Sequence, residues 1–179
     1  MKRHDWPKFL PDLPEAYAPW LRDHGSLTAR IRQRCTHFAV QPVQPVRNGL
    51  ARIAFDESSV LGIPPHRFAY SREVFLHADG KPVVFAHSTC ARIHLRGVWQ
   101  AVSGLGDRSL GSLLFGHPLL SRQPLHYLAL RGHHPLYRRA ASVLDNPPAT
   151  LWARRSLFYL HGAPLLVTEV FLPEILKLK

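Results

Sequence analysis

Hydrophobic and polar residues alternate most regularly between residues 150 and 173, and this pattern predicts two strands joined by a tight turn at 161–163. Side chains of a strand point alternately to its two faces, so every second residue shares a face. One face of the second strand then carries Leu165, Val167, Glu169 and Phe171. If this face is buried, Glu169 is either paired or functional, because an isolated buried carboxylate costs on the order of several kcal/mol.

A second hairpin is predicted over residues 68–86, where Asp79 and Gly80 separate two apolar-rich segments. An Asp-Gly pair favours the two-residue turns that join antiparallel strands. One face of the first strand of this hairpin carries Tyr70, Arg72, Val74 and Leu76. Arg72 is therefore, like Glu169, a charged residue on a face that is otherwise apolar.

Two interpretations of Arg72 and Glu169 are open from the pattern alone. They could form a structural buried ion pair, which adds little net stability because desolvation offsets the attraction. Alternatively, they could line a closed pocket. There Arg72 would hold a carboxylate in a bidentate fork, and Glu169 would accept a hydrogen bond or move a proton.

Weaker patterns along the rest of the chain predict shorter elements. In chain order these are a helix over 14–25, a helix capped by Ser26, strands over 36–46 and 50–55, a loop over 56–65, helical segments over 98–105 and 110–115, and a strand over 123–131. Residues 133–143 are open between a loop and a helical turn. Residues 1–13 are expected to form an extended arm that packs its aromatic side chains, Trp6 and Phe9, on the domain.

Together these elements predict an α+β fold in a single domain that spans residues 1–179. About six strands are joined mostly by short connections, and no alternating strand–helix–strand pattern occurs. A single antiparallel sheet covered by short helices is the natural architecture.

The net charge of +11 fits three kinds of partner: nucleic acid, a membrane surface or a small anionic substrate. The basic residues are scattered, without a run of five or more, so charge alone is weak support for nucleic-acid binding. No apolar run is long enough for a membrane-spanning helix. The first residues lack the apolar run of a secretory signal, and the cytoplasm is the expected location.

Motifs for metal or nucleotide chemistry are missing from the sequence. The twelve histidines show no metal-ligand spacing, and Cys35 and Cys90 suggest neither a disulfide framework nor a metal site. We therefore expect two reduced cysteines, no metal and no cofactor.

Three segments resemble the chorismate pyruvate-lyase family, in matching order and spacing over roughly residues 14–173. They are REVFLHADGKP (72–82), DRSLGSLLF (107–115) and WARRSLFYLHGAPLLVTEVFLP (152–173). The resemblance implies a six-stranded antiparallel sheet with helices forming a lid over an internal site. It also implies a cofactor-free, monomeric lyase that converts chorismate to 4-hydroxybenzoate and pyruvate for ubiquinone biosynthesis.

The resemblance assigns roles to four residues. Arg72 grips the ring carboxylate and Glu169 faces the ring hydroxyl at the far end of the pocket. Leu27 and Leu110 match positions whose backbone groups line the site. Leu27 stands where the family pattern has methionine, and His87 stands where an arginine is expected.

A different class of function also fits this fold. It resembles the effector-binding domains of some bacterial transcription regulators, which bind a small carboxylate without turning it over. Such a regulator normally carries a DNA-binding domain first, and about 25 residues before the dense match are too few for one. This favours the enzyme, without contact to nucleic acid.

Overall fold

The computed structural model describes residues 6–43 and 49–179, and its centre is one sheet in which every strand pair is antiparallel. Four long strands lie in the order β3-β4-β8-β7. Short strands extend both edges: β1 and β2 pair with β3, and β5 and β6 pair with β7. The strands are β1 (Phe38–Pro42), β2 (Leu50–Arg52), β3 (Phe68–Ala78), β4 (Lys81–Cys90), β5 (Ser121–Arg122), β6 (His126–Leu130), β7 (Leu151–Leu160) and β8 (Ala163–Phe171).

The α+β class and the single antiparallel sheet are confirmed, but the sheet has eight strands rather than about six. The difference lies mainly in the short edge strands. The predicted strand over 123–131 contains one strand, β6. The strand β5 lies just before it and has only two residues, which are too few to show an alternating pattern.

Both predicted hairpins are confirmed, and their turns fix the register of the sheet. Asp79 and Gly80 have φ angles of 48° and 78°, and His161 and Gly162 have φ angles of 48° and 77°. Two consecutive residues in the left-handed region form a turn whose twist matches that of the strands it joins. The second turn pairs Leu160 with Ala163 and therefore sets every later pair of β7 and β8.

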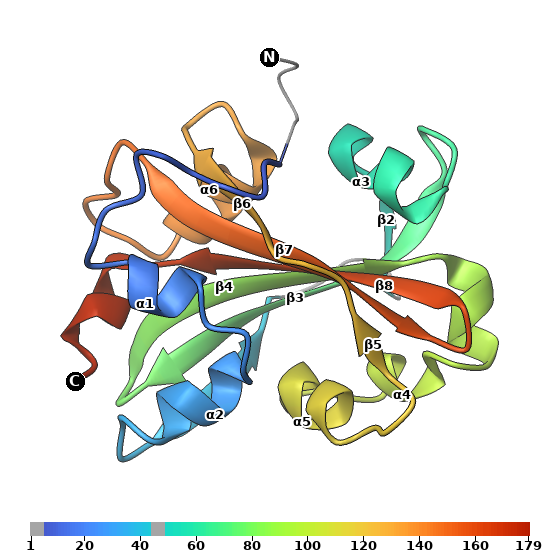
Figure 1. Cartoon of the computed structure of the whole chain (residues 1–179), viewed down its shortest axis with the longest axis horizontal. Helices are drawn as coiled ribbons and strands as arrows, with labels where there is room; N and C mark the ends of the chain where they lie inside the picture. The colour runs from blue at the N-terminus through green and yellow to red at the C-terminus, as the bar shows by residue number, and fades with distance from the viewer. Residues whose placement is uncertain (1–5, 44–48) are drawn as a thin grey trace.

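Helices cover both faces of the sheet. Figure 1 shows α2 (Leu27–Arg32) and α5 (Leu110–Phe115) on one side and α3 (Phe55–Leu61) and α6 (Pro135–Ala141) on the other. The apolar side chains of α1 (Ala18–Leu21) pack in one cluster with those of α2. Those of α4 (Gln100–Ser103) pack in another cluster with those of α5. Two short 3₁₀ helices, η2 (Arg92–Arg96) and η3 (Pro173–Lys177), follow β4 and β8.

Local signals explain where several of these helices begin. Ser26 caps α2 as predicted, because its side chain accepts a hydrogen bond from the backbone N–H of Ala29 at 3.3 Å. Residues 133–143, which the sequence leaves open, contain α6, and Pro135 occupies its first turn.

The loop predicted over 56–65 is wrong, because residues 55–61 form helix α3. Asp56, Glu57 and Ser58 are typical of turns when they are exposed, but all three are buried here. Glu57 accepts a hydrogen bond from the backbone N–H of Ala54 at 3.4 Å, which stabilises the start of the helix. The other partners of Asp56 and Glu57, which include Trp6, Arg155 and His87, lie far away in sequence, so local composition could not reveal them.

The N-terminal arm is confirmed in part. Trp6 is buried and its indole N–H donates to Asp56 at 3.0 Å, whereas Phe9 is 67% exposed. Residues 1–5 of the predicted arm and residues 44–46 of the predicted strand over 36–46 lie outside the described residues.

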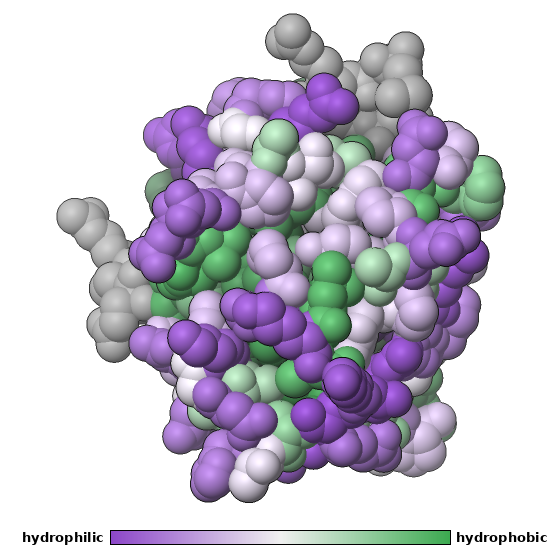
Figure 2. Space-filling view, turned by 90° about the vertical axis from the view of Figure 1, so that its left-hand side faces the viewer, coloured by the Kyte–Doolittle hydropathy of each residue, from purple (hydrophilic) through white to green (hydrophobic). Residues whose placement is uncertain are grey.

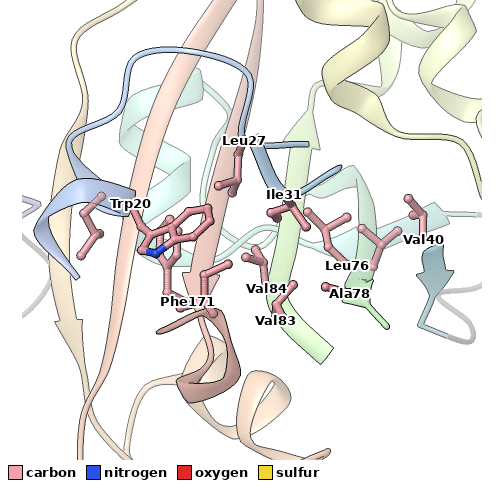
Figure 3. Close-up of a cluster of buried hydrophobic side chains, with 12 residues drawn as sticks. Trp20, Leu27, Ile31, Val40, Leu76, Ala78, Val83, Val84 and Phe171 are labelled. Atoms are coloured by element: carbon pink, nitrogen blue, oxygen red, sulfur yellow. The ribbon is translucent and has the colours of Figure 1, made fainter. Parts of the chain in front are cut away.

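The hydrophobic core is divided between the two faces of the sheet. On the side of α2, Trp20, Leu27 and Ile31 pack on Val84 and Phe171, as Figure 3 shows. On the other side, Phe75, Phe85 and Val170 pack under α6. The surface in Figure 2 is mostly hydrophilic, with hydrophobic side chains in small patches between the polar ones. No helix within the described ranges is long and apolar enough to cross a membrane.

Candidate functional site

A cavity lies between the sheet and the helices α2 and α5. It contains about 600 Å³ of empty space, part of which is open to solvent. Its walls come from β3, β4, β7 and β8 on the sheet side, with α2, α5 and β5 around them. The polar and charged side chains that line it are Thr28, Arg72, Ser88, Ser109, Arg122, Arg154, Ser156 and Glu169.

Arg72 lies on the cavity face of β3, as the alternating pattern predicts. Its Nη2 donates to the backbone carbonyls of Gly106 at 2.9 Å and Arg108 at 2.8 Å, in the loop before α5. Burial lowers the pKa of the Arg72 guanidinium. Within the described part of the chain Arg72 pairs with no carboxylate, so its charge is available to an anion in the cavity.

Glu169 lines the same cavity from β8 and is held by Arg154, its register partner on β7. The Nε of Arg154 donates to Oε2 of Glu169 at 2.5 Å. The guanidinium of Arg154 is buried. Its Nη1 also donates to three backbone carbonyls at the end of α1 and just beyond it, those of Trp20, Leu21 and Asp23, at 2.9, 3.3 and 2.5 Å. Its Nη2 is the buried side-chain nitrogen with no hydrogen-bond partner among the described residues.

Arg72 and Glu169 therefore do not form the structural ion pair of the first interpretation, because Glu169 pairs with Arg154 instead. The second interpretation, a pocket lined by both side chains, agrees with this arrangement.

Arg122 is a third arginine in the cavity, and β5 supplies it. Its Nε donates to Ser156 Oγ at 3.1 Å and its Nη1 to the carbonyl of His24 at 2.8 Å. Its guanidinium carbon lies 5.7 Å from the ring centroid of Phe115 and 5.2 Å from that of Phe158. Stacking on these rings and the two hydrogen bonds hold the guanidinium in one orientation.

The two leucines of the predicted site lie differently. Leu110, the first residue of α5, lines the cavity. Leu27, the first residue of α2, does not line it, and its side chain packs in the core beside Trp20 (Figure 3). Its neighbours Gly25 and Thr28 do line the cavity, so the predicted backbone contact at Leu27 stays a prediction.

The helices α2 and α5 touch each other over the cavity. Ser109 Oγ donates to Thr28 Oγ1 at 3.0 Å, and both side chains line the cavity. Gly111 lets the helices approach this closely. A Cβ at that position would lie 3.1 Å from Thr28 Oγ1 and 3.3 Å from the Oγ atoms of Ser109 and Ser26. These contacts make the pair of helices a cover over the site.

Charge in the cavity is strongly positive. Three arginines and one glutamate are its charged lining residues. Because guanidinium groups remain protonated, this arrangement favours a small ligand with more than one negative charge.

A second polar cluster lies on the opposite face of the sheet. His87 on β4 contacts Glu57 at 2.8 Å and Glu73 at 2.9 Å, and Thr89 at 2.7 Å, and Arg139 also pairs with Glu73. His87 therefore does not take part in the cavity. Within 6–43 and 49–179, no group of histidine, cysteine, aspartate and glutamate side chains is arranged to hold a metal ion.

The sequence pattern missed Arg122 and Arg154. A signal for Arg154 was present, because a turn centred on 161–162 places residue 154 opposite residue 169 in an antiparallel hairpin. Arg122 gave no comparable signal, since its strand has only two residues and alternation cannot be read from them.

The comparisons with known proteins agree with each other. The family model described as Chorismate lyase matches residues 6–178. A Nitrosomonas europaea protein named "Probable chorismate pyruvate-lyase" is 50% identical over 159 residues, 89% of this chain and 88% of the relative. A protein of the same name from Nitrosospira multiformis is 46% identical over 175 residues, 97% of this chain and 96% of the relative.

Solved structures with a similar fold are more distant. The PhnF C-terminal domain has a TM-score of 0.58 at 15% identity and covers 80% of this chain and 87% of its own. A GntR-family transcriptional regulator from Bacillus cereus has a TM-score of 0.54 at 14% identity and covers 78% of this chain and 94% of its own. At this identity the likeness concerns the fold alone.

Proposed function

Because the chain belongs to the chorismate lyase family, we propose that its cavity converts chorismate to 4-hydroxybenzoate and pyruvate. The observation that carries this proposal is the cavity lined by three arginines and one glutamate. Chorismate carries two carboxylates, one on the ring and one on the enolpyruvyl ether, and so matches the sign of this charge. The 4-hydroxybenzoate would serve ubiquinone biosynthesis.

Arg72 and Glu169 are the residues that we propose to hold the ring at its two ends. Arg72 fixes the ring carboxylate with the guanidinium nitrogens that are not bound to Gly106 and Arg108. Glu169 receives the ring hydroxyl through Oε1, since Oε2 is held by Arg154. Arg154 is thus a positioning residue that fixes the orientation of the carboxylate.

The reaction is an elimination that needs no change of oxidation state. The carbon that bears the hydroxyl loses its hydrogen as a proton, and the C–H electron pair completes the aromatic ring. The neighbouring C–O bond breaks with its electrons on the ether oxygen, and the enolpyruvate formed takes up a proton and becomes pyruvate. Aromatisation supplies much of the driving force, so the protein contributes positioning and charge stabilisation. In this scheme Glu169 accepts the ring proton.

The cover formed by α2 and α5 would control access to the reaction. The product keeps the carboxylate and the hydroxyl that Arg72 and Glu169 recognise, so it is expected to bind well in the same cavity. Opening of the cover and release of 4-hydroxybenzoate are then slow steps of the cycle.

The direct test is to incubate the purified protein with chorismate. Pyruvate is measured with a coupled lactate dehydrogenase assay, and the aromatic product is identified by chromatography and mass spectrometry. Equal amounts of pyruvate and 4-hydroxybenzoate are expected. Chorismate that binds but stays unchanged would overturn the lyase and leave the carboxylate-binding module.

Arg72→Ala tests the proposed recognition of the ring carboxylate. We expect kcat/KM for chorismate to fall about 100-fold or more, because a charged hydrogen-bond partner is lost in a half-buried site. Arg131→Ala is the matched control, since Arg131 is exposed and lies outside the cavity. Equal activity of both variants would contradict the role of Arg72.

A further inference from the structure

We propose that Arg122 binds the carboxylate of the enolpyruvyl group and so distinguishes the substrate chorismate from the product 4-hydroxybenzoate. This inference rests on the proposed function and concerns the same cavity. It assigns a substrate-binding role to a residue that the sequence pattern did not single out.

Arg122 is built into the cavity wall. Backbone pairing of Arg122 with Phe158 on β7 fixes the start of its side chain. The hydrogen bonds to Ser156 and to the carbonyl of His24 fix its end. A long, flexible side chain held at both ends has already lost most of its rotamer freedom, so binding an anion costs little further entropy.

No carboxylate of residues 6–43 and 49–179 neutralises Arg122 by direct contact. It forms no ion pair with any of the described residues, unlike Arg154 and the partly buried Arg30. Burial lowers the pKa of the Arg122 guanidinium, and the negative charge of Glu169 opposes this effect. Its Nη2 makes no hydrogen bond to the described protein and is therefore able to donate to a ligand.

The shape of chorismate determines where its second carboxylate lies in the cavity. The enolpyruvyl group is attached to the ring carbon next to the one that bears the hydroxyl. If Arg72 holds the ring carboxylate and Glu169 the hydroxyl, the second carboxylate has to lie toward the Glu169 end.

Arg122 lies toward that end. The charges of Glu169 and Arg154 both influence its pKa. It also donates to Ser156, which is two residues from Arg154 on the same face of β7. Arg154 directs its Nε to Glu169 and one Nη to the carbonyls of three other residues. Arg154 keeps one free nitrogen, Nη2, but its charge is already paired with Glu169, whereas Arg122 forms no ion pair among the described residues. Arg122 is thus the better placed of the two for the second carboxylate.

The position of Arg122 also suits the chemistry of the leaving group. When the ring C–O bond breaks, its electron pair stays on the oxygen of the departing enolpyruvate. A fixed guanidinium on the adjacent carboxylate stabilises this developing charge. The proton released by the ring balances it when the enolpyruvate becomes pyruvate.

The test compares two ligands in one variant. For Arg122→Gln we expect KM for chorismate to rise about 30-fold or more, because the second carboxylate loses its cation. The Kd of 4-hydroxybenzoate, measured by isothermal titration calorimetry, is expected to stay within about twofold, since the product lacks that carboxylate. Arg122→Lys keeps a charge and should recover part of the loss.

Arg72→Gln is the matched comparison, because it should weaken chorismate and 4-hydroxybenzoate together. Arg122→Gln that weakens both ligands equally, or neither, would overturn the proposal. Retained binding of 4-hydroxybenzoate shows at the same time that the cavity is folded. If the wild-type protein releases no pyruvate from chorismate, the proposed lyase activity is wrong. That result does not depend on the ligand affinities of Arg122→Gln, so the two proposals can fail separately.

Discussion

Arg154 is the residue on which the cavity and the core both depend. Its side chain is 1% exposed, pairs with Glu169 and donates to three backbone carbonyls near α1. Removing one partner of a buried pair leaves the other charge without compensation. We therefore expect Arg154→Ala to lower the free energy of unfolding by about 3–5 kcal/mol, measured by urea denaturation at pH 7.

Arg30→Ala is the control for Arg154→Ala. Arg30 pairs with Asp23 at 3.0 Å, but its side chain is 23% exposed. Pairs near the surface contribute about 1 kcal/mol or less, so this change should cost much less. Similar losses of unfolding free energy in both variants would mean that burial does not make the pair of Arg154 more stabilising than that of Arg30.

At this scale the sequence predicts which side chains share a face, but it does not predict what they meet. Period-two alternation correctly placed Arg72 and Glu169 on cavity-facing positions. The partner of Glu169 required the register of β7 against β8, which the turn position sets but alternation alone does not. Arg122 required the three-dimensional position of a two-residue edge strand.

The contact of α2 with α5 is a property of elements rather than of single side chains. Gly111→Ala adds a methyl group between three hydroxyl groups at 3.1–3.3 Å, so the two helices have to move apart slightly. A looser cover should raise the Kd of 4-hydroxybenzoate and lower kcat/KM for chorismate, each by about tenfold. Calorimetry and steady-state kinetics measure the two effects.

Gly104→Ala provides the comparison for this helix contact. A Cβ at Gly104 would meet only the carbonyl oxygen of Ala101, at 3.9 Å, which is an ordinary contact. Both variants replace a glycine by alanine close to the cover, so a change common to both would contradict the role of the α2–α5 contact.

Elements with a local signal were predictable, and elements stabilised by distant partners were not. Both hairpins follow from turn residues and alternation, and α2 follows from its cap. Helix α3 was missed because its first turn is polar. That turn is buried by contacts with Trp6, His87 and Arg155, which lie between 30 and 99 residues away in sequence.

At the scale of the whole molecule, the charged side chains of the cavity and those around His87 lie on opposite faces of one sheet. Alternating residues of β3 and β4 supply both groups: Arg72 and Ser88 face the cavity, while Glu73 and His87 face the opposite side. The group around His87 therefore contributes to stability without touching the ligand. This separation allows the pH dependence of folding to be measured apart from that of catalysis.

We expect His87 to make the stability of the folded protein depend on pH. Burial alone would lower the pKa of His87, but the carboxylates of Glu57 and Glu73 raise it from 6.5 to about 9. Because the folded state binds the proton more tightly, the stabilisation is complete below pH 6.5 and is lost as pH rises through 9. This rise in the pKa of His87 corresponds to about 3 kcal/mol.

Urea denaturation between pH 6 and pH 9.5 should therefore show a steady decline in the free energy of unfolding. His87→Gln should flatten this decline, although it lowers stability at every pH because Glu57 and Glu73 each lose one buried partner. His37→Gln is the control, since His37 faces Asp79 with 87% of its side chain exposed, and it should follow the wild-type profile. A wild-type profile that stays flat up to pH 9 would show that His87 does not hold its proton in the folded state.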